Sequence, residues 1–396
     1  MSQKPTQSGS SRYWKYLSTM LVYLLSFLFV INLIMPDATY SVVENRPLRS
    51  FPSPTIGTVV DGSYGLEVES YASDQFVGRN FLFHINYLVR KLSGQREIDE
   101  VFLGHGALLQ QNSLPAPGFL ENQINVINQF AGLTGIPTTV LVAPSAATIQ
   151  PSKLPMMAPV NDVTGSLDML YNGLGTLKTD VRKTLQDHAQ EYIFYRTDHH
   201  WTSQGAKLAA IELMGTFGQS INSEEFDSYK VSDHFEGTLA SKTGSVNLKD
   251  DIYICPDKKR TEYIVTWGDG SKTASIYDRA ALNQKDQYEL FLGRNQSLVH
   301  IETLSESQEN LLIFKDSYAN SMIQFLIPYY RNIYIVDPRY YYDDLAFLLA
   351  IGEITQCAFI FCGNTFFTDS SLQDVLNPYI TELAAAQAPA EDQAAT

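Results

Sequence analysis

The last third of the chain alternates short apolar runs with amphipathic stretches, and this pattern limits the fold more than any other feature of the sequence. Apolar runs at 310–314, 332–337 and 357–364 are separated by helical patterns at 318–328 and 344–353. Alternation of this kind implies crossover connections between parallel strands, with helices covering both faces of the sheet. We therefore expect an α/β fold built around a parallel sheet.

The middle of the chain extends this pattern. A β-branched run at 138–144 predicts a fully buried strand, and the amphipathic stretch 119–135 before it predicts a helix that ends at a glycine. Residues 191–195 predict a strand, and Thr202 or Ser203 can cap the helix that follows. From about 222 to 305 the sequence has many Thr, Tyr, Gly and Asp residues and short β-like runs, which we interpret as a β-rich insertion.

The N-terminus predicts a membrane anchor. Residues 16–35 form an uncharged apolar run of the length that crosses a bilayer as a helix. The run ends without an A-x-A cleavage pattern, so we expect it to be retained. Basic residues precede the run and acidic residues follow it (Lys4, Arg12 and Lys15, then Asp37 and Glu44). The positive-inside rule then places the C-terminal part outside the cytoplasm, as a single-pass protein of the cell membrane.

These signals together give the expected organisation of the chain. The expected parts are a cytoplasmic N-terminus (1–16), a transmembrane anchor (17–35), a juxtamembrane linker (36–64), a catalytic α/β domain (65–383, with the β-rich insertion at about 222–305) and a disordered tail (384–396).

Charge and cysteine content narrow the possible ligands. The formal net charge of -15 argues against nucleic-acid binding, which needs clustered Lys and Arg. The charge is compatible with a neutral sugar or a small acyl ligand, and equally with a solvated acidic surface. Cys255, Cys357 and Cys362 form neither a CxxC pair nor a His-Cys metal spacing, and the last two lie in an apolar run where we expect buried thiols. We expect no metal and no cofactor.

The densest chemical motif is "TDHHW" at 197–201. A metal site is one interpretation, but adjacent side chains of an extended segment point to opposite faces, which argues against both histidines binding one ion. Asp198 and His200, two positions apart, would instead share a face. The carboxylate could then hold one imidazole nitrogen and orient the other toward a nucleophile.

Ser317 is the candidate nucleophile. It lies in "KDSYAN" at 315–320, a polar turn between an apolar strand and a predicted helix. Such a turn supplies backbone N–H groups for a developing oxyanion. The carboxyl ends of parallel strands meet at one edge of a sheet, where Ser317 could reach His200. An Asp-Ser pair at a strand end is also a common helix cap without any catalytic role, and spacing does not separate the two interpretations.

The ordered motifs resemble the DHHW family of bacterial extracytoplasmic proteins, which is related to the alginate O-acetyltransferase proteins of the SGNH-hydrolase-like group. The resemblance extends over most of the chain from about Glu44. It rests on the order of these pieces: "ENRPL" (44–48), "DQFVGR" (74–79), "FLGHGALL" (102–109), "TDHHW" (197–201), "FEGTLASKTG" (235–244), "KDSYAN" (315–320) and "VDPRYYY" (336–342).

The resemblance implies a role for each site residue. Asp198 would be the orienting carboxylate, His200 the base and Ser317 the nucleophile, with His199 in a variable position of the motif. Asn364 is the candidate for the oxyanion-binding Asn, and Arg339 is a second candidate for stabilising the oxyanion or gripping substrate. The "GxND" pattern of standard SGNH enzymes is missing, and the Asp-His pair precedes the serine. The family relation therefore implies a three-layer α/β/α fold with a circularly permuted motif order.

The implied activity is O-acetylation of a cell-envelope polysaccharide or oligosaccharide, with the acyl group delivered by a membrane-bound O-acyltransferase partner. The same triad would serve a carbohydrate acetylesterase if water were the acceptor. A non-catalytic scaffold that binds polysaccharide is the alternative outside enzymes. Retention of Asp, His and Ser together argues against the scaffold.

Overall fold

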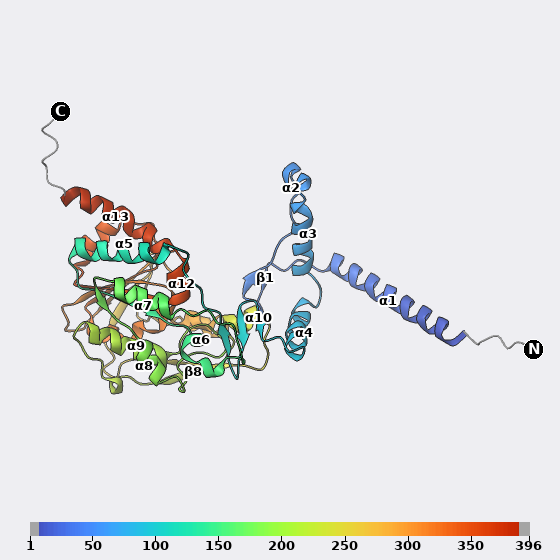
Figure 1. Cartoon of the computed structure of the whole chain (residues 1–396), viewed down its shortest axis with the longest axis horizontal. Helices are drawn as coiled ribbons and strands as arrows, with labels where there is room; N and C mark the ends of the chain where they lie inside the picture. The colour runs from blue at the N-terminus through green and yellow to red at the C-terminus, as the bar shows by residue number, and fades with distance from the viewer. Residues whose placement is uncertain (1–7, 388–396) are drawn as a thin grey trace, which may run out of the picture. The chain divides into compact units, whose positions relative to one another are not determined.

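The computed structural model describes residues 8–387, and the chain divides between residues 93 and 94 into two units (Figure 1). The first unit begins with α1, whose segment Arg12–Ile34 is the one stretch among residues 8–387 that is long and apolar enough to cross a membrane. The unit's elements are α1 (Ser8–Ile34), β1 (Tyr40–Ser41), β2 (Arg46–Pro47), α2 (Ile56–Val60), α3 (Ser63–Asp74) and α4 (Arg79–Leu92).

Helices α3 and α4 belong to this first unit, although the sequence analysis assigned residues from 65 onward to the α/β domain. Their apolar spacing resembles that of core helices. Charged residues of the first two family motifs instead connect elements within the unit. Asp74 pairs with Arg46 at 2.6 Å, and Glu44 pairs with Arg79. The α/β unit therefore begins at Gly94.

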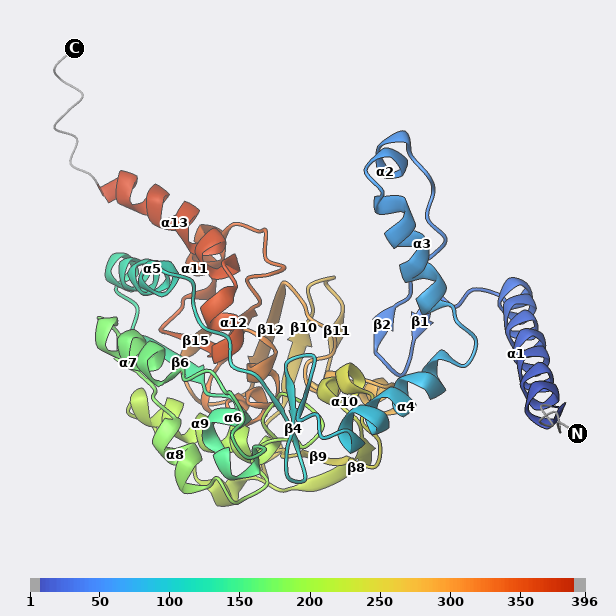
Figure 2. The same ribbon diagram turned by 45° about the vertical axis from the view of Figure 1, so that its right-hand side comes forward.

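The second unit is built on one eight-stranded sheet, with strand order β11-β10-β12-β14-β13-β15-β6-β7. Figure 2 labels β6, β15, β12, β10 and β11 of this sheet. The strands from β14 to β7 are parallel, as the alternating sequence pattern predicts. β12, β10 and β11 extend the sheet in antiparallel orientation. The strands are β6 (Thr138–Ala143), β7 (Leu177–Lys178), β10 (Tyr263–Thr266), β11 (Lys272–Thr273), β12 (Leu298–Thr303), β13 (Asn310–Lys315), β14 (Asn332–Val336) and β15 (Gln356–Cys362).

Two apolar cores cover the two faces of this sheet, because successive strand side chains point to opposite sides. Leu311 and Ile313 of β13 belong to one core, and Leu312 and Phe314 belong to the other. Helices α8 (Arg182–Asp187) and α9 (Ser203–Thr216) contribute to the first core, while α5 (Phe119–Thr134), α7 (Thr164–Gly173), α11 (Leu345–Gly352) and α13 (Ser371–Gln387) contribute to the second. The molecule is thus a mixed α/β fold around a large central sheet.

The remaining elements are short. They are two small antiparallel sheets, β3 (Glu97–Ile98), β4 (Val101–Leu103) and β5 (Leu108–Gln110), and β8 (Tyr229–Phe235) with β9 (Asp250–Ile254); the helices α6 (Ala146–Ile149), α10 (Thr238–Thr243) and α12 (Gly363–Thr368); and 3-10 turns that include η4 (Gln287–Leu290), η5 (Ser317–Ser321), η6 (Ile323–Phe325) and η7 (Ile327–Tyr329).

Three segments differ from the sequence-based expectations. Residues 318–328, expected as one helix, form the successive 3-10 turns η5 to η7. Residues 191–195 form no strand of the central sheet; a single bridge pairs Phe194 with Trp201. The segment 222–305 divides, since β8 and β9 form a separate sheet while β10 to β12 extend the central one. At the C-terminus α13 continues to Gln387, and the rest of the expected tail lies outside the described residues.

Candidate active site

The nucleophile candidate Ser317 lies where β13 ends at the carboxyl edge of the parallel strands. Asp316 forms this turn: its Oδ1 accepts a hydrogen bond from Tyr318 N at 2.9 Å, and its Oδ2 accepts one from Cys362 N at 2.9 Å. One carboxylate oxygen therefore closes the turn, and the other ties it to the end of the neighbouring strand β15. Asp316 acts as the cap that a purely structural interpretation predicted, while the side chain of Ser317 remains partly exposed.

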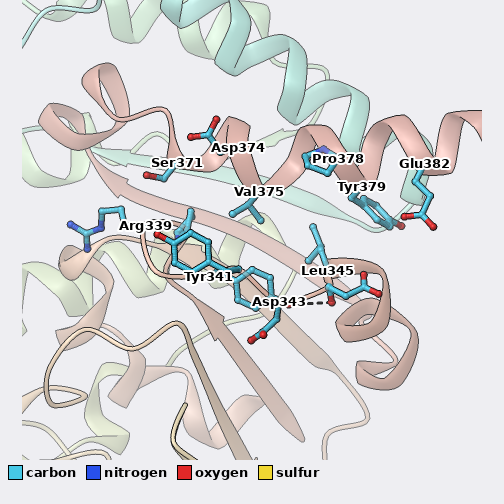
Figure 3. Close-up of a pocket in the computed structure, with 13 residues that line it drawn as sticks. Arg339, Tyr341, Asp343, Leu345, Ser371, Asp374, Val375, Pro378, Tyr379 and Glu382 are labelled. Atoms are coloured by element: carbon cyan, nitrogen blue, oxygen red, sulfur yellow. Dashed lines mark hydrogen bonds between the residues drawn. The ribbon is translucent and has the colours of Figure 1, made fainter.

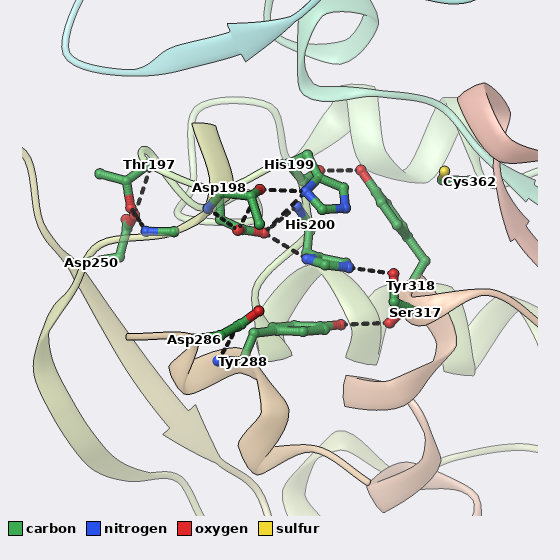
Figure 4. Close-up of polar contacts among 12 residues, drawn as sticks. Thr197, Asp198, His199, His200, Asp250, Asp286, Tyr288, Ser317, Tyr318 and Cys362 are labelled. Carbon is green, nitrogen blue, oxygen red and sulfur yellow. Dashed lines mark hydrogen bonds and ion pairs between the residues drawn. The ribbon is translucent and has the colours of Figure 1, made fainter. Parts of the chain in front are cut away.

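Asp198, His200 and Ser317 form a continuous hydrogen-bonded chain (Figure 4). His200 Nδ1 is 2.6 Å from Asp198 Oδ1, and His200 Nε2 is 2.8 Å from Ser317 Oγ. The carboxylate is 1% exposed and the imidazole 4%, so both groups are largely shielded from water. An imidazole held on one side by a carboxylate and on the other by a hydroxyl is arranged to take the hydroxyl proton.

The carboxylate of Asp198 is held in its ionised form. Burial opposes ionisation, but it is outweighed by the positive charge available on His199 and His200 and by hydrogen bonds from His200 and Thr238, so the pKa is lowered. Thr238 donates to Oδ2 through its backbone N–H at 2.7 Å and through its hydroxyl at 2.9 Å. Asp198 therefore carries its charge at neutral pH and can stabilise a protonated His200.

His199 does not point away from Asp198, which contradicts the expectation from an extended segment. Residues 196–200 form bends, and the rings of His199 and His200 lie 3.8 Å apart. His199 Nδ1 is 2.8 Å from the hydroxyl of Thr238. Burial, together with the charge of His200, lowers the pKa of His199 to about 4, so this imidazole is neutral at physiological pH.

These bends also bring ligand atoms of Asp198, His199 and His200 within 4.8 Å of one another, as a metal site requires. The hydrogen bonds favour a different use of these groups. Both ring nitrogens of His200 are already engaged, one by Asp198 and the other by Ser317. Binding an ion through His200 would break one of these two contacts. The donor set therefore fits proton transfer better than metal ligation.

The motif loop is fixed by residues that the sequence analysis did not single out. Asp250, 1% exposed, accepts hydrogen bonds from the backbone N–H groups of Arg196 and Thr197 and from the hydroxyl of Thr197 at 2.6 Å. Gly237 N donates to the same Thr197 hydroxyl at 2.9 Å. The "FEGTLASKTG" motif thus helps to position the motif loop, because its residues Gly237 and Thr238 pack against Asp198.

Tyr288 of η4 forms the other side of His200. Its ring stacks on the imidazole with centroids 3.8 Å apart and an interplanar angle of 11°. Its hydroxyl donates to Ser317 O at 3.0 Å and lies 3.2 Å from Ser321 Oγ. No short motif pointed to Tyr288, because its position depends on how the 276–292 segment folds over the turn.

The two oxyanion or substrate candidates are held by other contacts. Asn364 lies at the start of α12 and lines a small pocket with Asp198, His199 and Tyr318. Its amide, however, donates to Gln111 O and accepts from Ser113 N, both at 2.9 Å.

Arg339 forms a two-pronged ion pair with buried Asp337, at 2.7 and 2.9 Å. Asp337 also contacts Lys315 Nζ, 3.3 Å away and likewise buried. The side chain of Arg339 is thus engaged by Asp337, and the roles of Asn364 and Arg339 stay predictions.

Comparison with known proteins confirms the family resemblance. Residues 169–336 match the family model described as DHHW protein. A DHHW family protein from Eubacterium siraeum is 24% identical with a TM-score of 0.61, covering 70% of this chain and 98% of that one. Bacillus cereus PatB1 with a sulfonyl adduct is 16% identical with a TM-score of 0.56, covering 66% and 93%. The O-acetyltransferase domain of Pseudomonas putida AlgJ is 14% identical with a TM-score of 0.45, covering 72% and 99%. A search of curated proteins found no match.

Proposed function

We propose that this chain is a membrane-anchored, extracytoplasmic O-acetyltransferase that modifies a cell-envelope polysaccharide through a triad of Ser317, His200 and Asp198. The observation that carries the proposal is the unbroken chain of contacts from the Asp198 carboxylate through His200 to Ser317 Oγ, at 2.6 and 2.8 Å. The match to the DHHW family model and the apolar helix α1 support it.

The first half of the reaction would acylate the serine. Ser317 Oγ attacks the carbonyl carbon of an acetyl donor while His200 Nε2 takes the hydroxyl proton. The imidazolium is stabilised by Asp198. As the carbonyl re-forms, the bond to the leaving group breaks, and His200 returns the proton to that group.

The second half transfers the acetyl group. A sugar hydroxyl gives its proton to His200 and attacks the acetyl-serine, and Ser317 leaves with the proton that His200 returns. Backbone N–H groups at the turn, starting with that of Ser317, would hold the oxyanion in both halves, assisted by Asn364 or Arg339. With water as acceptor the same steps hydrolyse the ester, which is the acetylesterase alternative. The donor would be supplied by a membrane-bound O-acyltransferase.

The proposal includes an SGNH-like fold with a permuted motif order. In support, the Asp-His pair at 198–200 precedes the serine at 317 in the sequence, yet all three side chains meet near the carboxyl edge of the parallel strands. The β8–β9 sheet, which supplies Asp250 beneath the motif loop, would then belong to the insertion.

Hydrolysis of a chromogenic acetyl ester by the full chain tests the triad. Ser317→Ala and His200→Ala should each reduce kcat by at least about 10³-fold. Matched controls are Ser370→Ala, an exposed serine, and His188→Ala, a partly exposed histidine paired with Glu191. Equal turnover by all variants would disprove the triad.

A second assay separates transferase from esterase. Adding an oligosaccharide acceptor and measuring its mass detects acetyl transfer directly. A gain of one acetyl group that requires Ser317 supports the transferase. Release of acetate alone, with no modified sugar over a range of acceptors, supports the esterase.

A further inference from the structure

A cavity of about 380 Å³ lies beside the catalytic edge of the sheet and is not used by the triad (Figure 3). One wall is the loop that follows β14 and carries Tyr341 and Asp343. The opposite wall is α13, which contributes Asp374, Tyr379 and Glu382. Its volume falls in the range of sites that bind small molecules. β14 is the parallel neighbour of β13, so the loop that starts this cavity leaves the sheet one strand away from Ser317.

The cavity continues toward the triad along the carboxyl edge. It shares Arg339 and Ser371 with a second depression that reaches Thr365 in α12. Gly363, two residues earlier in the same short helix, lines the small pocket that contains Asp198 and His199. The cavity and the second depression are therefore contiguous, and α12 contributes residues both to that depression and to the pocket beside Asp198. An extended ligand could occupy the cavity while presenting one of its groups to Ser317.

The lining of the cavity suits a sugar chain. Tyr342, which is 91% exposed, and Tyr379 offer aromatic rings, and aromatic walls with a few placed polar groups are typical of such sites. Asp343, Asp374 and Glu382 offer carboxylate oxygens that accept hydrogen bonds from hydroxyl or ammonium groups. The lining therefore favours ligands that donate hydrogen bonds over ligands that accept them.

The charge of the lining selects among glycans. Four acidic residues line the cavity, Asp343, Asp344, Asp374 and Glu382, against a single cation, Arg339. The carboxylate of Asp344 also caps α11 by accepting hydrogen bonds from two backbone N–H groups. That cation is already neutralised by its two-pronged pair with Asp337. A polyuronate would bring further carboxylates into this negative field, whereas an ammonium group would be attracted.

We propose that this cavity is a binding subsite for the acceptor glycan and that it selects an uncharged or amino-bearing chain while rejecting a polyuronate. The proposal rests on the proposed function for the identity of the reaction, but binding can be measured without turnover. Tyr379 provides the stacking surface and Asp374 the charge discrimination.

Calorimetric titration of the full-length Ser317→Ala chain in detergent tests this selection. The probes are tetrasaccharides of N-acetylglucosamine, glucosamine and mannuronate, which are uncharged, cationic and anionic at neutral pH. We expect the first two to bind and the third not to bind. Tyr379→Ala should weaken binding of the first two about tenfold. Asp374→Asn should weaken only the cationic probe.

Tyr229→Ala serves as the matched control, because Tyr229 is an exposed tyrosine on β8 that does not line the cavity. The proposal is overturned if mannuronate binds as tightly as the other probes, if none of the three binds, or if Tyr379→Ala behaves like this control. A different result would disprove the proposed function: the unaltered chain, which retains Ser317, would show no Ser317-dependent ester hydrolysis. Tyr229→Ala in that background should hydrolyse the small ester at the unaltered rate.

Discussion

Replacing Gly237 with alanine tests whether the carboxylate of Asp198 must stay where the structure places it. A Cβ added to Gly237 would lie 2.3 Å from Asp198 Cβ and 2.4 Å from Asp198 Oδ2. Ordinary contacts of a Cβ atom begin at 3.4 Å, so Gly237 or Asp198 must move by about 1 Å. Glycine is needed at position 237 for lack of space and not for its backbone conformation, since the φ of Gly237 is an ordinary -81°.

The displacement acts on two sets of contacts at once. Asp198 Oδ2 accepts both hydrogen bonds from Thr238, the residue after Gly237, while Oδ1 holds His200. A misplacement of about 1 Å in a catalytic array costs about 10²-fold in rate, equivalent to about 2.7 kcal/mol. Complete loss of an orienting carboxylate costs about 10⁴-fold. We expect kcat/KM for an acetyl ester to fall between these two limits.

Steady-state hydrolysis of a chromogenic acetyl ester measures the loss, and Gly215→Ala is the matched control. Gly215 lies in α9, and a Cβ added there meets no atom within 4 Å. Thermal unfolding checks that both variants fold. The proton NMR signal of His200 Nδ1–H, which reports the 2.6 Å contact with Asp198, should shift or disappear only in the Gly237 variant. A folded Gly237→Ala chain with the rate and NMR signal of Gly215→Ala would refute the reasoning.

Substitutions at three further residues probe the surroundings of the triad. Asp250→Asn puts an amide group against the N–H donors of the motif loop, so denaturant unfolding should show a loss of about 2–4 kcal/mol. Burial, followed by the charge of Asp198, raises the pKa of Asp286 to about 6, so the folded chain keeps a proton there that the unfolded chain releases near pH 4. Ionisation of Asp286 therefore lowers the stability of the folded chain as the pH rises. Asp286→Asn should match the stability of the unaltered chain below pH 4 and exceed it by up to about 3 kcal/mol above pH 6. Equal stability of the two chains at both pH values would contradict this. Tyr288→Phe keeps the ring on His200 and should lower kcat less than about fivefold, whereas Tyr288→Leu removes the stacked ring and should lower it at least about tenfold; equal losses would assign the effect to the hydroxyl.

The sequence determined the architecture of the parallel part of the sheet. Apolar runs of strand length have to be buried on both faces, so β6, β13, β14 and β15 could be read from hydrophobicity alone. Contacts between residues close together in the sequence could also be predicted. Thr202, one of the two predicted caps, caps α9 through its own side chain. The spacing of Asp198 and His200 likewise specified a pair that contact each other.

The rest depended on contacts between segments far apart in the sequence. The predicted helix at 318–328 forms a series of 3-10 turns instead. In the first of these turns Tyr318 O accepts a hydrogen bond from the Trp201 indole, and Ser317 O accepts one from the Tyr288 hydroxyl. The two-residue periodicity of an extended segment predicted that His199 points away from the site. The segment bends instead, and His199 lies against His200 and contacts Thr238. Propensity describes a segment by itself, whereas these conformations are set by partners that the segment meets only after folding.

What the sequence by itself determined is therefore the parallel part of the sheet, the candidate anchor and the three candidate residues of the triad. Only the tertiary structure decided how Ser317 meets His200, that Gly237 leaves room for Asp198, and that Asp250 and Tyr288 support the array. It also decided that Tyr342 and Tyr379 line one acidic cavity. The physical reason is that reactivity and selectivity depend on distances between side chains, which are fixed by close packing of the whole unit rather than by order along the chain.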